Sequence, residues 1–161
     1  MSNSREDIKI FNKDNVSELI NDDYLFDSLV TFEQEHFTWP WKKESWECFL
    51  ESNRDFSLAL MFGADGFVGF CLFELFILDM QCHLYKIVVS PQVRGQGVSI
   101  NLFDKHLAEL KGLGVSEIYL EVEASNERAM VFYEKYGLAR GIIKKGFYQD
   151  GSNAIVMTGS F

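Results

Sequence analysis

The chain has 161 residues, about the length of one domain, and 47% of them are hydrophobic, so disorder and fibrous folds are excluded. Fifteen Lys and Arg against 24 Asp and Glu give a formal net charge of −9, which argues against a nucleic-acid-binding face and favours a cationic substrate or partner. The three cysteines, Cys48, Cys71 and Cys82, are odd in number and widely spaced. This usage is typical of a reducing cytoplasm and of neither a disulfide framework nor a zinc site. We expect one domain over residues 1–161.

Neither a targeting segment nor a membrane span is expected. Residues 1–7 are polar and lack the apolar run of a signal peptide. The most apolar stretch, residues 56–80, contains Glu74 and is broken at residues 63–66, so each half is too short to cross a bilayer about 30 Å thick. We interpret this stretch as a buried hairpin in a cytoplasmic protein.

The hydrophobic pattern predicts the order strand, helices, three strands, helix, strand, helix, two strands. Strands are predicted over residues 8–11, 56–62, 67–78, 84–89, 118–122, 138–144 and 154–158, and helical segments over 14–37, 41–52, 100–110 and 129–136. The third helix is expected to bury Ile100, Phe103, Leu107 and Leu110. Hairpins without crossover helices exclude a purely parallel sheet. We therefore predict an α/β fold with a mixed, mainly antiparallel twisted sheet flanked by helices on both faces.

Acidic residues concentrate in the first third of the chain. Residues 1–55 hold 13 acids and 6 bases, whereas residues 56–161 hold 11 acids and 9 bases. Seven acids and no Lys or Arg lie between Asp14 and Trp41. Two interpretations stay open: a solvated helix face, or an acidic rim that attracts a basic substrate.

A glycine-containing loop lies between a predicted strand and an amphipathic helix, over residues 89–100. The N–H groups at a helix N-terminus lack intrahelical partners and attract phosphate, and glycines let the phosphate approach the backbone. A nucleotide P-loop is excluded because the chain contains no Gly-Lys-Ser/Thr tripeptide. A dinucleotide fingerprint needs a small residue where Ile100 stands and a loop directly after the strand. The ligand class that remains is coenzyme A.

Two segments resemble the GCN5-related N-acetyltransferase (GNAT) family. The pattern Arg94-x-x-Gly97-x-Ser99 is similar to the acetyl-CoA loop of that family, and residues 120–138 are similar to its closing motif. Within the family, the nearest likeness is to the ribosomal-protein-alanine N-acetyltransferases (RimI type), supported by an aromatic-Pro-Trp segment at residues 37–41. The likeness covers roughly residues 37–158. It implies the GNAT fold, acetyl-CoA as co-substrate and acetyl transfer to a primary amine.

The resemblance also implies a role for individual residues. It makes Glu121 the general base and Tyr133 the acid that protonates the departing sulfur. Cofactor contacts are implied for the strand residues Ile87, Val88 and Val89, one of whose N–H groups polarises the acetyl carbonyl, and for Arg94, Gly95, Gln96, Gly97, Val98, Ser99 and Asn126. Peptide contacts are implied for Trp39, Trp41 and Tyr148. No metal is expected, because the three histidines lack the spacing of metal ligands.

Other interpretations of these residues remain open. Pattern alone would make Glu121 an outward-facing strand residue, Asn126 an N-cap and the two tryptophans core residues. The sequence departs from the family at Ser99 (usually Gly or Ala), Leu138 (Phe), Glu123 (often Arg) and Asn153 (often Asp). The last two departures bear on the substrate.

The resemblance implies that the acceptor is the N-terminal α-amine of a protein, by analogy a basic ribosomal one. The first alternative is a small cationic amine, such as a polyamine or an aminoglycoside. The second is a non-catalytic acyl-CoA-binding regulatory module. The sequence leaves open the preferred N-terminal residue and the oligomeric state.

Overall fold

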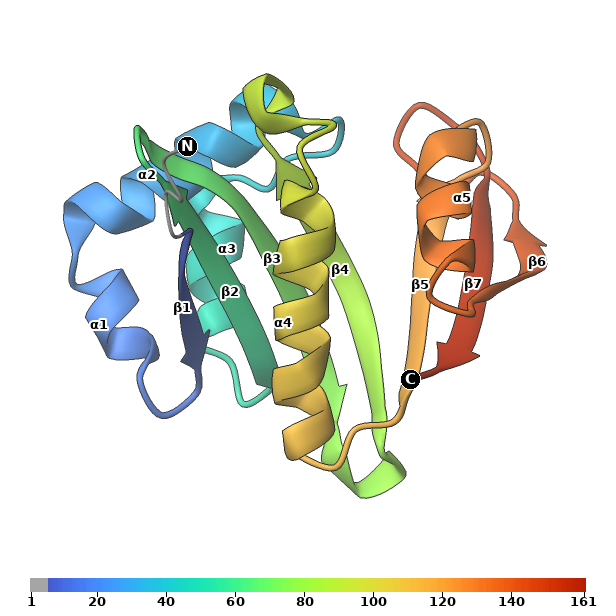
Figure 1. Ribbon diagram of the computed structural model, residues 1–161, viewed down its shortest axis with the longest axis horizontal. Helices are drawn as coiled ribbons and strands as arrows, with labels where there is room; N and C mark the ends of the chain where they lie inside the picture. Colours follow the sequence, from blue (N-terminus) through green and yellow to red (C-terminus); the bar gives the residue numbers. More distant parts are fainter. Residues whose placement is uncertain (1–5) are drawn as a thin grey trace. The chain divides into compact units, whose positions relative to one another are not determined.

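A computed structural model describes residues 6–161, so most of the polar segment used against a signal peptide lies outside the described residues (Figure 1). Seven strands form one sheet in the order β1-β2-β3-β4-β5-β7-β6. The strands are β1 (Asp7–Asn12), β2 (Asp55–Gly63), β3 (Gly66–Phe76), β4 (Gln81–Val89), β5 (Glu117–Glu123), β6 (Ala139–Lys144) and β7 (Ala154–Ser160). The helices are α1 (Val16–Ile20), α2 (Asp23–His36), α3 (Lys43–Leu50), α4 (Val98–Gly112) and α5 (Glu127–Glu134), with 3-10 turns at Ile77–Asp79 and Pro91–Val93.

The predicted fold class is confirmed. β1 pairs antiparallel with β2, and β7 pairs antiparallel with both β5 and β6, whereas β4 and β5 run parallel. The sheet is therefore mixed and mainly antiparallel, as the hairpins without crossover helices indicated.

The helical segment predicted over residues 14–37 is confirmed. It forms two helices, because the Asp22 side chain caps α2 by accepting the Leu25 N–H at 3.0 Å. Two local predictions were wrong. The strand predicted over residues 67–78 ends at Phe76, and Leu78 is fully exposed in the following turn. Ile100 is 47% exposed, since Leu102 occupies the buried side of α4 instead.

The described residues group into two compact units. The first unit comprises residues up to Glu74 together with Lys86–His106, and the second comprises Leu75–Tyr85 and Leu107–Phe161. The expectation of a single acetyltransferase domain over residues 1–161 stays a prediction. Within residues 6–161, no helix has both the length and the apolar character needed to cross a membrane.

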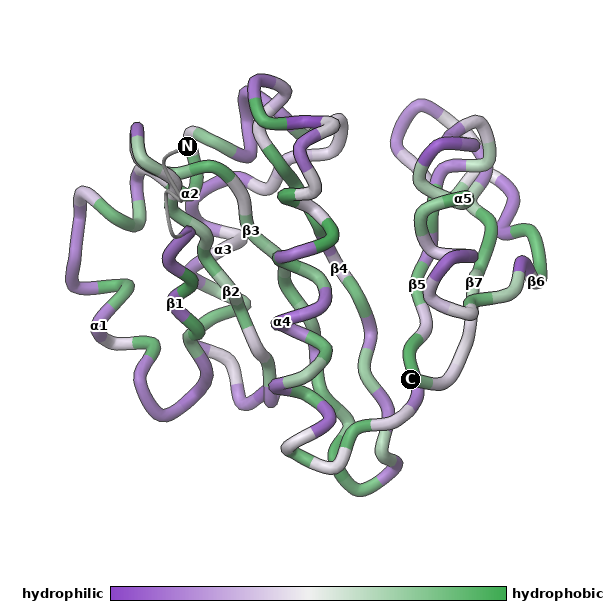
Figure 2. Tube along the Cα trace, in the orientation of Figure 1, coloured by the Kyte–Doolittle hydropathy of each residue, from purple (hydrophilic) through white to green (hydrophobic). Residues whose placement is uncertain are grey.

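The first unit is built around β2 and β3, whose traces are mostly hydrophobic in Figure 2. Trp46 of α3 packs edge-on against Phe70, with ring centroids 5.7 Å apart. Phe73, three residues after Phe70 in β3, packs instead against Phe103 and His106 of α4. Because residues an odd number apart in a strand point to opposite faces, α3 and α4 cover opposite faces of β3 in this unit. The predicted helices on both faces are confirmed here.

His106 is an ionisable side chain in the core of the first unit. It is 0% exposed, and its Nε2 lies 2.8 Å from Ser57 Oγ on β2. Its Nδ1 is buried without a hydrogen-bond partner among residues 6–161. Burial lowers the pKa of His106 to about 3, because the charged imidazolium would lose its hydration.

We expect His106 to make the protein sensitive to acid. Below pH ~6.5 the unfolded chain binds a proton at His106 that the folded chain does not, so stability falls as pH falls toward about 3. The loss is about 1.4 kcal/mol per pH unit. Urea unfolding of the wild type and of His106→Gln between pH 7.5 and 4.5 measures it. The wild type is expected to lose more stability than the variant at every step below pH 6.5, and parallel curves would contradict this assignment.

In the second unit β5 lies between the N-terminal half of β4 and β7. Gln81–Leu84 pair with Glu117–Leu120, and all of β5 pairs with β7. Ile118, Leu120 and Val122 are buried on one face of β5. The intervening residues, Glu117, Tyr119, Glu121 and Glu123, therefore share the other face. This second face carries the ionisable groups described below.

Candidate active site

The glycine loop and the start of α4 form an exposed turn in the first unit. Gly95 and Gly97 both have φ of 78°, a left-handed conformation that favours glycine, and a Cβ built on either would meet no described atom within 4 Å. The first α-helical bond joins the Asn101 N–H to the Gly97 carbonyl. The N–H groups just before Asn101 therefore have no acceptor within the helix, and Ser99 adds a hydroxyl among them. This donor set fits a pyrophosphate group, which is the part of coenzyme A that the predicted loop residues Arg94–Ser99 would hold.

The strand before this loop is closely packed. The Ser90 N–H donates to the Val68 carbonyl at 2.8 Å, and a Cβ on Gly69 would come within 2.8 Å of the Val88 carbonyl oxygen. Only glycine at position 69 allows β3 to approach this part of β4 so closely. The role of Gly69 could not be predicted from the sequence, because a glycine inside an apolar strand carries no signal of what packs against it.

A buried ion pair in the first unit was also missed. Glu33 of α2 bonds Lys86 of β4, and the Trp46 indole N–H donates to the same carboxylate at 2.6 Å. The side chains of Glu33 and Lys86 are 0% and 3% exposed. Burial lowers the pKa of Lys86 to about 8 and raises the pKa of Glu33, while the mutual attraction of the pair opposes both shifts.

The aromatic-Pro-Trp segment lies against this ion pair. Lys86 Nζ is 4.0 Å from the centroid of a Trp41 ring, and Trp41 packs edge-on against Trp46 at 5.1 Å. Both Trp39 and Trp41 are half-buried. Trp41 therefore has a packing role over a buried cation. The predicted peptide contacts of Trp39 and Trp41 stay predictions.

Glu121 is the centre of a charged cluster in the second unit. Its Oε2 lies 2.6 Å from His83 Nε2 of β4, and its Oε1 accepts a bond from Lys144 Nζ of β6 at 2.7 Å. The Glu121 side chain is 9% exposed. The hydrogen bond from His83, aided by that from Lys144, holds the pKa of Glu121 at about 2 although burial acts in the opposite direction. Glu121 therefore stays ionised throughout the neutral range.

Helix α5 positions Asn126 and Tyr133. The Asn126 side chain accepts the Ala129 N–H at 3.1 Å, so its capping role is confirmed. Tyr133 is 7% exposed on the buried side of the helix. The predicted cofactor contact of Asn126 and the acid role of Tyr133 stay predictions.

Tyr148 lies in the turn between β6 and β7. Its N–H donates to the Ser152 carbonyl at 3.1 Å, and Asn153 Oδ1 accepts the Gly146 N–H at 3.0 Å. Asn153, a departure from the family pattern, thus helps to close this turn. Burial and the nearby charges of Glu123 and Glu121 raise the pKa of Tyr148 to about 12, so its phenol keeps its proton.

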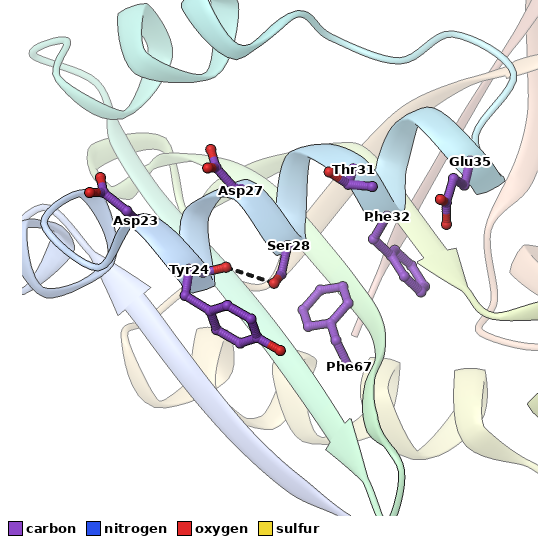
Figure 3. A pocket seen from close by; sticks show the side chains of 8 residues that line it. All are labelled: Asp23, Tyr24, Asp27, Ser28, Thr31, Phe32, Glu35 and Phe67. Atoms are coloured by element: carbon purple, nitrogen blue, oxygen red, sulfur yellow. Dashed lines mark hydrogen bonds between the residues drawn. The ribbon is translucent and has the colours of Figure 1, made fainter.

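A hollow of about 450 Å³ runs along α2 in the first unit (Figure 3). Asp23, Asp27 and Glu35 line it together with the rings of Phe32 and Phe67. Three of the seven acids that the sequence analysis noted thus line one hollow. The Asp27 carboxylate also accepts a hydrogen bond from Lys43 at 2.7 Å.

Comparison with known proteins shows which family has this fold and this glycine loop. The model of the acetyltransferase (GNAT) family matches residues 26–138. The chain belongs to this family. It is accordingly an acetyltransferase, and the predicted resemblance is confirmed.

Individual family members are similar over most of the chain. A Bacillus subtilis (strain 168) protein assigned as a ribosomal protein bS18-alanine N-acetyltransferase is 32% identical over 81% of this chain and 86% of its own length. The Escherichia coli ribosomal-protein-S18-alanine N-acetyltransferase has the same fold, with a TM-score of 0.79 at 22% identity, covering 96% of this chain and 93% of that one. Arabidopsis thaliana NAA60, solved in complex with acetyl-CoA, has a TM-score of 0.74 at 13% identity, covering 96% of this chain and 99% of that one.

The functional candidates that the sequence analysis missed are His83 and Lys144. They lie 38 and 23 residues from Glu121, and only strand pairing brings them to its carboxylate. A usable signal was the alternation of His83 and Tyr85 with buried neighbours in β4, which marks a polar face of an otherwise apolar strand.

Proposed function

We propose that this enzyme transfers the acetyl group of acetyl-CoA to the N-terminal α-amine of a basic protein, by analogy a ribosomal one, in the cytoplasm. The observation that supports acetyl-CoA as the co-substrate is the run of backbone N–H donors after Gly95, which suits a pyrophosphate. The acceptor is inferred from the B. subtilis relative, whose assigned name specifies a ribosomal protein. The free cysteines fit a reducing compartment.

The proposed roles follow the order of the chemistry. The loop Arg94–Ser99 holds the pyrophosphate, and Asn126 adds a hydrogen bond to the cofactor. A backbone N–H within Ile87–Val89 polarises the acetyl carbonyl, which makes its carbon open to attack by the amine. Glu121 and the groups bonded to it draw the proton from the attacking amine, and Tyr133 protonates the departing thiolate.

The peptide end of the site is proposed at Trp39, Trp41 and Tyr148. An α-amine is easier to deprotonate than a lysine side chain by about 3 kcal/mol, because their pKa values are near ~8 and ~10.4. A base of ordinary strength therefore suffices for an α-amine. The net charge of −9 attracts a basic protein to this enzyme.

Thiol release from acetyl-CoA with three acceptors side by side tests the proposal. The acceptors are an arginine-rich peptide with a free N-terminus, the same peptide blocked at its N-terminus, and spermidine. Release with the free peptide alone is the expected result. Release with the blocked peptide would instead indicate acetylation of a side chain, and release with none of the three would overturn the proposed acceptor.

A small cationic amine is the second candidate acceptor. The hollow along α2 favours it, because carboxylates beside aromatic rings suit an ammonium group. Release with spermidine and not with the free peptide would assign this function. Asp23→Asn, at the hollow, would then raise the KM for spermidine.

A further inference from the structure

His83 lies between charged and aromatic groups of the second unit, beside the face of β5 that carries Glu121. Its ring stacks on Tyr119 with centroids 4.2 Å apart and planes 13° from parallel, and it lies tilted against Tyr85 at 4.5 Å. Its Nε2 lies 2.6 Å from Glu121. The ring is therefore fixed on two sides and at one nitrogen, while its side chain keeps 14% of its surface exposed.

The two nitrogens of His83 differ in what surrounds them. In the neutral ring with the proton on Nε2, this nitrogen donates to Glu121, and Nδ1 carries the lone pair. Nδ1 makes no hydrogen bond within residues 6–161, and it is not among the fully buried, unpaired polar atoms of that part of the chain. It is thus the basic nitrogen of the cluster.

Glu121 itself is poorly suited to keep a proton. One of its oxygens bonds His83 and the other bonds Lys144, so a proton on the carboxylate would weaken both contacts. The pKa of Glu121 is about 2 for the same reason, because the bonds from His83 and Lys144 favour the ionised carboxylate. A carboxylate in this position is better suited to orient an imidazole and to stabilise the imidazolium.

We propose that His83 is a catalytic residue that takes the proton of the acceptor amine at Nδ1, and that Glu121 orients the ring and stabilises its positive charge. This inference rests on the proposed function. The amine nitrogen forms a bond to the acetyl carbon while the bond from that carbon to sulfur breaks. The proton lost by the amine goes to Nδ1 and then to solvent, and Tyr133 protonates the thiolate and regains its own proton from solvent.

Several other groups surround His83. Tyr85 on its own strand and Tyr119 and Glu121 on β5 contact its ring, and Lys144 on β6 bonds Glu121. Lys144 bonds the other oxygen of Glu121. Its positive charge disfavours an imidazolium nearby, while its hydrogen bond holds the carboxylate in place.

His83→Gln tests the role of the ring in turnover. We expect kcat with the preferred acceptor of the panel to fall about 100-fold or more. The KM for acetyl-CoA should stay unchanged. Added imidazole should restore part of the activity of His83→Ala, because it can occupy the space of the missing ring. The matched control is His36→Gln on α2, which should keep wild-type kinetics.

One outcome would overturn the proposal. It is a folded His83→Gln enzyme, checked by thermal unfolding, that keeps kcat within about threefold of the wild type, since an effect of that size is far below general-base catalysis.

An NMR titration of the His83 ring tests its pairing with Glu121 independently of enzyme activity. The C2–H resonance of His83, one of three histidines, is followed by NMR in the wild type and in Glu121→Gln. Its midpoint should move to lower pH in the variant, because the imidazolium loses its carboxylate. An unchanged midpoint would overturn the pairing of His83 with Glu121, whether or not the enzyme is active with the acceptors tested. A wild type that acetylates none of these acceptors would count only against the proposed function.

Discussion

Glu33→Gln is expected to lower the free energy of unfolding by about 3–5 kcal/mol, because the substitution leaves a buried ammonium without its counter-charge. Lys86 is 3% exposed and has the Glu33 carboxylate as its ion-pair partner. The Trp41 ring at 4.0 Å offers Lys86 only a weak electrostatic substitute. Urea unfolding at pH 7 measures the change.

Two further variants separate this loss from the mere removal of a charge. The double substitution Glu33→Leu with Lys86→Met should recover part of the stability, because apolar groups of similar volume replace the buried pair, although the Trp46 indole N–H then loses its acceptor. Lys43→Ala breaks the exposed contact of Lys43 with Asp27 and should cost less than about 1 kcal/mol. A loss in Glu33→Gln no larger than that in Lys43→Ala would show that the buried pair is not held in the way described.

Glu121→Gln is expected to lower turnover by about 10²–10⁴-fold, because the general-base catalysis that usually contributes this factor depends on the Glu121 carboxylate. The variant keeps the shape of the side chain and removes the charge that holds His83 and Lys144. Binding of acetyl-CoA should be unchanged, because the proposed cofactor contacts are made by the loop Arg94–Ser99, the strand residues Ile87–Val89 and Asn126, and not by the Glu121 side chain. Steady-state thiol release and calorimetric titration with acetyl-CoA measure the two quantities.

Glu117→Gln is the matched control for this substitution. Glu117 lies on the same face of β5, and its carboxylate accepts a hydrogen bond from Gln81 at 2.9 Å. Its removal should leave turnover within about twofold of the wild type, as expected for an exposed group that takes no part in proton transfer. Equal losses in the two variants would mean that the charge of this face, rather than the Glu121 cluster, matters.

Much of the fold could be predicted because local patterns carry it. Apolar alternation marks β5, and the Phe-rich runs around residues 63–66 mark the β2–β3 hairpin, since each strand must bury one face or both. The glycine loop was predictable for a similar reason. Gly95 and Gly97 adopt a positive φ that other residues rarely adopt, so the sequence itself records the turn.

Local patterns were less reliable where two signals competed. Ile100 fits the helical stripe of α4 by spacing, yet Leu102 is the residue that the core buries. There the burial available in three dimensions outweighed the local spacing. The division of residues 14–37 into α1 and α2 is instead a local effect, because the Asp22 side chain caps α2.

Local sequence patterns predict the order of the elements, the loop suited to a pyrophosphate and the family resemblance. Which ionisable side chains meet depends on the tertiary structure. Glu33 and Lys86 are 53 residues apart, and His83 and Glu121 are 38 apart. Hydrophobic periodicity tells which face of an element is buried, whereas the strand pairing and helix packing decide what lies opposite. The protonation states at the candidate site depend on those partners, because burial and neighbouring charges set each pKa.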